Sequence, residues 1–263
     1  MSGLGDLEVS TGKELKTVPE LYDDGLKSAV QESGKTLALL PRVINAALAP
    51  VRIWVAQKEY NVAETEKLLA KKLEKVGVEN VVSPEAYVAV PALQAISYSM
   101  NSEELRDLYA NLLSSAMTKD RKWTVHPSYV EVIKQITPDE AKLLKSLVNK
   151  EDVFPLVDVR LITPEKSYLV KVRNFTNIAE GVCEFPANIF AYLDNLTRLK
   201  ILEIPSGVSL TDDNEYKPLE ANPVIQNLIK SKVPDGFEWE IEHKEFNITE
   251  YGHNFIDTCV KGL

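Results

Sequence analysis

Residues 102–118 read SEELRDLYANLLSSAMT and decide the fold of the first half of the chain. Their apolar residues recur at steps of three and four, which places the side chains on one face of an α-helix. This face consists of Leu105, Leu108, Tyr109, Leu112, Leu113, Ala116 and Met117. Ser102 or Asn101 can cap the helix, because a short polar side chain accepts a hydrogen bond from a free amide of the first turn. The pattern predicts a helix whose apolar face lies in the core.

Helical spacing also dominates the wider region from Leu21 to Ile136. Within it, residues 58–76 interleave lysines with glutamates, which is typical of a solvated helix face rather than of a nucleic-acid-binding surface. The lysines of this face are Lys67, Lys71, Lys72 and Lys75. Residues 1–19 are polar and contain several glycines, serines and threonines, so we expect them to form a flexible tail.

Proline marks the start of several predicted helices. The missing N–H of proline is harmless in the first turn of a helix, where the amides have no partner within the helix. Residues 137–140, Thr-Pro-Asp-Glu, add a capping box, in which threonine and glutamate each satisfy the other's backbone amide. The four X-Pro pairs are Ser83-Pro84, His126-Pro127, Thr137-Pro138 and Asn222-Pro223.

Beyond Thr137 the pattern changes. Residues 156–162 and 167–175 alternate like two strands around a turn, and residues 238–248 predict a further strand. Helical spacing returns over residues 189–199, and Thr249 begins a last helix. We therefore predict an α+β protein that is mostly α, with a domain boundary near Thr137. An N-terminal helical domain spans residues 20–137, and a mixed C-terminal domain spans residues 138–263.

Composition restricts the function. The chain has 263 residues, a formal net charge of -9 and a sequence pI of about 5.1. An acidic surface repels phosphate backbones, which disfavours nucleic-acid binding. Cys183 and Cys259 are too few and too far apart for a disulfide framework or a zinc site, so no metal and no cofactor is predicted. The first residues lack the pattern of a secretory signal, and a reducing cytoplasm is the expected location.

One apolar stretch raises the question of a membrane. Residues 36–56, TLALLPRVINAALAPVRIWVA, approach the length of a membrane span. Arg42 and Arg52 place charge within the stretch, and Pro41 and Pro50 interrupt it. We therefore expect a buried helix–break–helix rather than a membrane span.

Three quoted stretches resemble the Abi-alpha family, bacterial proteins named for abortive infection. They lie between residues 22 and 148: YDDGLKSAVQESGKTLALLPRVINAALAPV, ELRDLYANLLSSAM and VHPSYVEVIKQITPDEAKLL. The resemblance implies a role in defence against phage, with no established reaction to inherit.

The C-terminal part resembles a winged helix. IFAYLDNLTRLKILEI is similar to the third helix of such a module and the strand after it, and FNITEYGHNFIDTCV is similar to its end. Many winged helices have glycine at the position of Lys200, and residues 205–237 replace a short wing with a long insertion. Asp194 and Glu203 offset the charges of Arg198 and Lys200, which favours protein contacts over DNA binding.

Arg121 and His126 are the candidate catalytic residues. The pair resembles the arginine–histidine motif of the HEPN superfamily of RNases, in which histidine transfers a proton and arginine holds a phosphate. The structural alternative is that His126, directly before Pro127, caps a helix through a ring nitrogen, and that residues 122–125 form a loop. The sequence favours this second interpretation.

Two further sequence patterns give weaker indications. Residues 29–36, AVQESGKT, match a loose phosphate-loop pattern, but no buried strand precedes them and no apolar run ending in aspartate follows. His243 and His253 lack a second ligand at metal-binding spacing and are expected to be surface or core histidines.

Together the patterns predict a cytoplasmic phage-defence component that acts through protein contacts, with a protein partner or a second copy, and without catalysis of its own. Two alternatives stay open. One is an RNase that uses Arg121 and His126, and the other is a DNA-binding regulator that uses the winged-helix-like domain.

Overall fold

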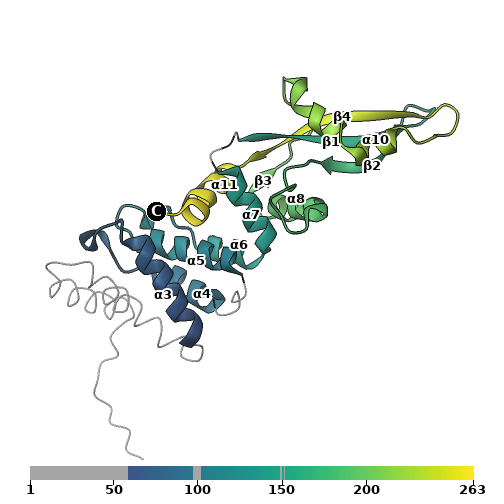
Figure 1. Cartoon of the computed structure of the whole chain (residues 1–263). Helices are drawn as coiled ribbons and strands as arrows, with labels where there is room; N and C mark the ends of the chain where they lie inside the picture. Colours follow the sequence, from purple (N-terminus) through teal and green to yellow (C-terminus); the bar gives the residue numbers. More distant parts are fainter. Residues whose placement is uncertain (1–58, 97–101, 149, 151) are drawn as a thin grey trace, which may run out of the picture.

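The computed structural model describes residues 59–96, 102–148, 150 and 152–263 (Figure 1). The α-helices are α3 (Glu59–Leu73), α4 (Ala86–Ile96), α5 (Glu103–Ala116), α6 (Ser128–Lys134), α7 (Pro138–Leu147), α8 (Ile189–Arg198), α9 (Lys217–Glu220), α10 (Pro223–Ile229) and α11 (Glu250–Phe255). The strands are β1 (Val153–Ile162), β2 (Tyr168–Phe175), β3 (Leu202–Glu203) and β4 (Glu238–Ile248). Short 3-10 helices are η2 (Val78–Asn80), η3 (Lys122–Thr124), η4 (Pro186–Asn188) and η5 (Asp213–Tyr216), and η6 (Ile256–Lys261) is a π-helix. The predicted α+β class is confirmed.

Helix α5 is the centre of the helical region. The Ser102 hydroxyl accepts a hydrogen bond from the Leu105 amide at 3.2 Å, as the capping pattern predicts. The predicted apolar face is buried, and Leu112 and Leu113 are 0% exposed. Because α3, α4, α6, α7 and η6 all contact α5, the helix positions most of the elements around it.

Helix α7 begins with the predicted capping box. The Glu140 amide donates to Thr137 Oγ1 at 3.2 Å, and the Thr137 amide donates to Glu140 Oε2 at 2.6 Å. Pro138 and Pro223 lie in the first turns of α7 and α10, as predicted. Pro127 differs slightly, because it occupies the N-cap position of α6, one residue before the helix.

The four strands form one antiparallel sheet in the order β2-β1-β4-β3. β1 pairs with β4 along its whole length, from Val153 opposite Asn247 to Ile162 opposite Glu238. An irregularity in the β1–β2 pairing follows Val157. There the buried Asp158 carboxylate accepts a hydrogen bond from the Asn174 amide at 2.7 Å.

The insertion expected at residues 205–237 contains η5, α9 and α10. Its buried residues form a second apolar cluster against β1 and β2. The buried members of this cluster are Val157, Val159, Phe175, Tyr216, Leu219 and Ile225. The insertion therefore covers one face of the sheet, a contact that its sequence pattern did not predict.

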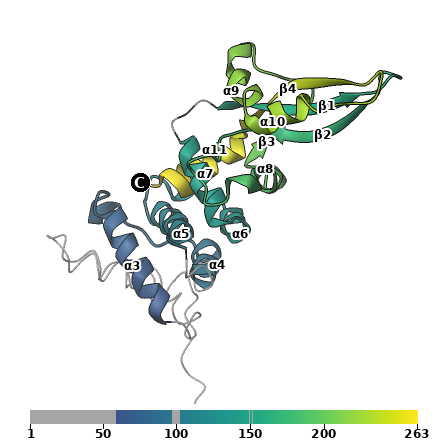
Figure 2. The same cartoon turned by 45° about the vertical axis from the view of Figure 1, so that its right-hand side comes forward.

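The main apolar core is continuous across Thr137. It contains Leu69 of α3, Leu112 of α5, Leu144 of α7 and Phe246 of β4. Figures 1 and 2 show α3 to α7 gathered at one end, with the sheet extending away from them beyond α8 and α11. The division into domains at residues 20–137 and 138–263 stays a prediction, and the tail predicted for residues 1–19 lies outside the described residues.

Helix α8 ends in a C-cap that contains a left-handed residue. The Ile201 amide donates to the Leu196 carbonyl at 3.0 Å, and the Lys200 amide donates to Thr197 at 3.0 Å, which together form a Schellman C-cap. This motif requires a left-handed residue, and Lys200 has φ 61°. The glycine that winged-helix modules often have at this position would adopt this conformation without strain.

Among the described residues, no helix combines the length and the apolar character that crossing a bilayer requires. The apolar stretch at residues 36–56, for which the sequence raised the question, lies outside them.

Candidate functional site

Arg121 follows α5 and binds the C-terminal helix. Its Nη1 donates to the Gly262 carbonyl at 2.6 Å, and its Nη2 donates to the Asp257 carbonyl at 2.8 Å. These carbonyls lie in and just after η6, where the end of a helix leaves carbonyl groups without partners in the helix. The two bonds occupy both terminal nitrogens of the guanidinium group.

Asn111 and Ser115 of α5 also donate hydrogen bonds to backbone carbonyls of η6. Asn111 is buried, and its Nδ2 donates to the carbonyls of Cys259 at 2.8 Å and Val260 at 3.1 Å. Ser115 Oγ donates to the Thr258 carbonyl at 3.3 Å. The two side chains lie four residues apart on one face of α5, so α5 satisfies successive carbonyls of the π-helix.

His126 contacts the start of α6. Its Nδ1 accepts a hydrogen bond from the Ser128 amide at 3.2 Å and lies 2.6 Å from Ser128 Oγ. Ser128 Oγ is also 2.6 Å from the hydroxyl of Tyr251. A ring nitrogen of His126 therefore accepts a backbone amide at the start of α6, but the N-cap residue is Pro127 and not His126, so the predicted cap position is wrong by one residue.

Tyr129 and Tyr251 pack beside His126. The ring centroids of His126 and Tyr129 are 6.0 Å apart, and those of Tyr129 and Tyr251 are 5.4 Å apart. Burial, and then the nearby Cys259 and Tyr251, raise the pKa of Tyr129 to about 12. Burial also raises the pKa of Tyr251, against the effect of its hydrogen bond to Ser128. Both phenols stay protonated near neutral pH.

Arg121 and His126 thus bind different parts of the molecule. Within the described range 102–148, where both lie, no hydrogen bond or ring contact joins them, and their partners are η6 on one side and α6 with α11 on the other. η3 (Lys122–Thr124) occupies the intervening segment that the sequence predicts as loop. Whether the pair is catalytic stays a hypothesis.

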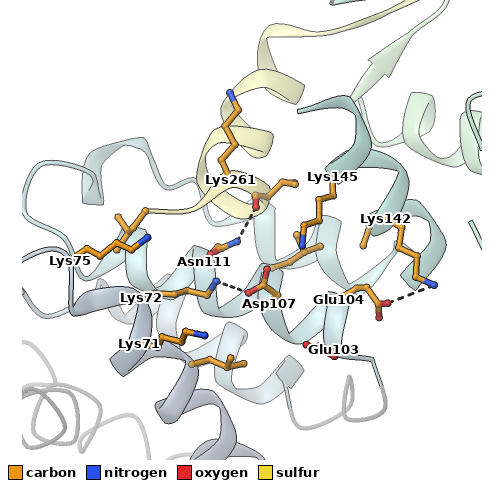
Figure 3. A pocket seen from close by; sticks show the side chains of 15 residues that line it. Lys71, Lys72, Lys75, Glu103, Glu104, Asp107, Asn111, Lys142, Lys145 and Lys261 are labelled. Carbon is orange, nitrogen blue, oxygen red and sulfur yellow. Dashed lines mark hydrogen bonds and ion pairs between the residues drawn. The ribbon is translucent and has the colours of Figure 1, made fainter. Parts of the chain in front are cut away.

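A second candidate site is a pocket of about 640 Å³ between α3, α5, α7 and η6 (Figure 3). Six lysines and three acidic side chains line it, so positively charged side chains outnumber negatively charged ones by three. These residues are Lys71, Lys72, Lys75, Lys142, Lys145 and Lys261, with Glu103, Glu104 and Asp107. Leu68, Leu108, Ala141 and Val260 contribute apolar surface.

Three of the lysines are paired with carboxylates. Lys72 Nζ lies 2.5 Å from Asp107 Oδ1. Lys142 Nζ lies 3.7 Å from Glu104 and 3.4 Å from Asp139, and Lys261 Nζ lies 2.7 Å from Asp257. Partial desolvation lowers the pKa of Lys142, but its hydrogen bond to Asp139 and the nearby carboxylates outweigh this effect and raise the pKa. Lys142 therefore stays charged.

The other three lysines, Lys71, Lys75 and Lys145, have no carboxylate within ion-pair distance among the described residues. In Figure 3 the amino groups of Lys71 at the end of α3 and of Lys75 in the turn after it extend toward the space in front of α5, and that of Lys145 extends from α7 toward Asp107. Lys261 points away from this space, and Lys142 points toward Glu104 at its edge. The three unpaired lysines therefore face the pocket from two sides, Lys71 and Lys75 from the end of α3 and Lys145 from α7.

No pattern in the sequence predicted this pocket. The sequence correctly predicts that Lys71 and Lys75 are exposed, but it interprets their helix face as merely solvated. The capping box correctly places α7, but no local pattern indicates that Lys145 faces α3. The pocket depends on tertiary packing around α5, so the unusual density of lysines in residues 67–75 was the one signal available.

The remaining sequence candidates do not form a metal site. His243 Nε2 lies 2.7 Å from Glu220 Oε1. The His243 ring stacks on that of Tyr216, with the ring centroids 3.8 Å apart. His253 lies 3.6 Å from Asp152. Within the residues that the structure describes, no cluster of three or more histidine, cysteine or acidic side chains could hold a metal ion. The phosphate-loop pattern at residues 29–36 lies outside those residues.

Comparison with protein families identifies the group to which the chain is related. The family described as "abortive infection alpha" (Abi_alpha) matches residues 57–259, which include Arg121, His126, the whole sheet and the lining of the pocket except for Val260, Lys261 and Leu263. The chain belongs to the Abi-alpha family. The match extends well past residue 148, where the resemblance seen in the sequence ended, so both predicted domains contribute to the family's pattern. Neither a curated protein nor a solved structure matches the chain. Membership in the Abi-alpha family suggests a role in abortive infection, a defence against phage.

Proposed function

We propose that this Abi-alpha protein is a phage-defence component that acts through contacts with another protein or a second copy, without catalysis of its own. The observation that supports contacts is a pair of exposed aromatic side chains, Tyr87 of α4 and Trp123 of η3, called here the aromatic surface. Trp123 is 78% exposed and Tyr87 is 60% exposed. Large aromatic side chains are enriched at the centres of protein interfaces.

Lys122 contacts both the Trp123 ring and Glu85, which precedes α4. Lys122 Nζ lies 4.3 Å from the centroid of the Trp123 ring and 3.9 Å from Glu85 Oε1. Glu85 precedes Tyr87 by two residues, so the ion pair links the start of α4 to η3. A cation over the ring restricts the rotation of Trp123, which reduces the entropy that binding would otherwise cost.

The experiment replaces both aromatic residues by alanine and measures phage protection in cells together with the melting temperature. Because the two side chains are exposed, we expect Tyr87→Ala/Trp123→Ala to melt like the wild type and to lose protection. Phe185→Ala is the matched control, since Phe185 is also exposed and aromatic but lies by α8. Full protection by the double variant at normal abundance would contradict the proposal.

The competing hypothesis is an RNase that uses Arg121 and His126. The two bonds from Arg121 to backbone carbonyls weigh against a phosphate-holding role, because they fix the guanidinium group against η6 and the residue after it. His126→Asn separates the hypotheses: an asparagine oxygen can accept the Ser128 amide, but asparagine does not titrate near neutral pH. We expect His126→Asn to keep protection. A stable variant without protection would favour the RNase.

The proposal assigns the C-terminal part to a winged-helix-like module that does not bind DNA. Arg198 supports this assignment, because its guanidinium group donates to Asn195 Oδ1 at 2.6 Å and to Gln135 Oε1 at 3.0 Å. Salt-sensitive duplex binding that is lost on Arg198→Ala/Lys200→Ala would contradict it. A cytoplasmic location is also part of the proposal, and the free thiols of Cys183 and Cys259 support it.

A further inference from the structure

We infer that the lysine-lined pocket binds a phosphate-bearing small molecule of nucleotide size. This inference goes beyond the proposed function, which does not require a ligand. It rests on Lys71 of α3, Lys75 just after α3 and Lys145 of α7, which have no carboxylate partner among the described residues. Among the lining acidic side chains, Glu103 is the one for which the structure gives no ion pair, so three unpaired lysine side chains face one unpaired acidic side chain.

The free lysines do not stabilise the fold by pairing. Lys71 lies in the last turn of α3, and Lys75 lies four residues later, just after the helix. Both line the pocket, so their like charges repel each other. Lys145 brings a third positive charge from α7 toward the same space. A bound anion would relieve this repulsion, whereas the chain as a whole, with a net charge of -9, gives no general reason to gather cations here.

The chemistry of the pocket suits phosphate. All its cationic side chains are lysines, whose compact charges bind phosphate groups. The volume of about 640 Å³ lies within the usual range of small-molecule sites. Leu68, Leu108 and Val260 supply apolar surface beside the lysines, which suits a ligand that also has a base or another apolar part.

Asn111 and Lys72 line the pocket but already have hydrogen-bond or ion-pair partners in the protein. Asn111 Nδ2 is committed to the carbonyls of Cys259 and Val260. Lys72 is likewise committed to Asp107. The phosphate groups would therefore bind between Lys71, Lys75 and Lys145, and these residues define the test.

The experiment measures binding to the full chain by calorimetry, with ATP, inorganic pyrophosphate and adenosine as separate probes. We expect ATP and pyrophosphate to bind and adenosine to bind at least tenfold more weakly, because it lacks the charges that the lysines recognise. Raising the salt concentration should weaken ATP binding, since exposed charges are screened. A bound ligand should also raise the melting temperature.

The decisive variant is Lys71→Gln/Lys145→Gln, which removes one free charge from each side. Both side chains are exposed, so we expect an unchanged melting temperature and at least tenfold weaker binding of ATP and pyrophosphate. The matched control, Lys230→Gln/Lys232→Gln, removes the same charge from exposed positions after α10 and should bind like the wild type.

Four results would overturn the inference. They are no binding of ATP or pyrophosphate at low salt, equal loss in the pocket variant and the control, binding of a hexaglutamate peptide in place of the phosphate probes, and sedimentation with phosphatidylglycerol vesicles without binding of soluble phosphates. None of these measurements depends on phage protection, so the inference and the proposed function can fail separately.

Discussion

Arg121 Nη1 donates to the carbonyl oxygen of Gly262 at 2.6 Å, and this bond connects the segment after α5 to the turn after η6. The second bond, from Nη2 to Asp257, lies at the other end of the same π-helix region. One planar guanidinium group therefore holds two carbonyls in a fixed relative position. Arg121, which resembles one member of a catalytic arginine–histidine pair, therefore has a structural role.

We expect Arg121→Ala to lower the free energy of unfolding by about 1–3 kcal/mol, because two backbone carbonyls lose charged donors. Arg121→Lys should lose part of this amount, since one ammonium group cannot reproduce the fork geometry. Chemical denaturation measures both effects. Arg173→Ala, an exposed arginine of β2, is the control and should be close to neutral. Wild-type stability of Arg121→Ala would show that the two bonds contribute nothing.

The centre of α5 gives a second prediction. Leu112 is 0% exposed and belongs to the main core, so Leu112→Ala should leave a cavity and cost about 2–5 kcal/mol. The control is Leu169→Ala, because Leu169 on β2 is nearly half exposed. The melting temperature of Leu112→Ala should fall well below that of Leu169→Ala. Equal melting temperatures would place Leu112 outside the core.

Local patterns explain which parts of the fold could be predicted from the sequence. The stripe from Leu105 to Met117 and the capping box of Thr137 and Glu140 depend on residues within one or two turns of each other. Strand β4 was predicted at its observed bounds, because its residues alternate around apolar positions. Helices and strands that carry their own signals are therefore predictable.

Contacts between distant segments carry no such signal. Asn111 and Cys259 are 148 residues apart, and nothing near Asn111 indicates that its amide supports a π-helix. The same holds for Lys145 opposite Lys71, and for the packing of Tyr216 on the sheet. The sequence singled out Arg121, but its partners are the backbone carbonyls of Gly262 and Asp257. Because every residue has such a carbonyl, no side-chain pattern indicates which ones Arg121 binds, and its contacts could not be predicted.

Lys200 provides a prediction of increased stability. Its φ of 61° is the left-handed conformation, which costs a residue with a Cβ atom about 1–2 kcal/mol. Glycine adopts this conformation freely but loses more chain entropy on folding, so Lys200→Gly should raise the free energy of unfolding by about 1 kcal/mol. Lys200→Ala is the control, because it removes the charge and keeps Cβ. If both variants gained equally, the charge of Lys200 rather than its conformation would be the cause.

Asp139 holds the segment before α8 against the start of α7. It is 5% exposed, and its carboxylate accepts hydrogen bonds from the amides of Glu184 at 2.9 Å and Phe185 at 2.8 Å and from the Tyr192 hydroxyl at 2.9 Å. Burial alone would raise the pKa of Asp139, but the two amide bonds and the bonds from Tyr192 and Lys142 outweigh it and hold the pKa below its usual value. The ionised form is therefore the form that stabilises the fold.

This lowered pKa makes the effect of Asp139→Asn depend on pH. At pH 7 we expect a loss of about 1–3 kcal/mol, because asparagine turns an NH₂ group toward donors that need an acceptor. The contribution of the carboxylate is fully present above the pKa of about 3.9 in the unfolded chain and is lost as the pH falls through the lower folded value. The melting-temperature gap between wild type and Asp139→Asn should thus be constant from pH 7 to 5 and narrow below pH 4. Asp194→Asn, on the exposed side of α8, should show little gap at pH 7. A gap for Asp139→Asn that stays constant down to pH 3 would mean that ionisation of Asp139 does not stabilise the fold.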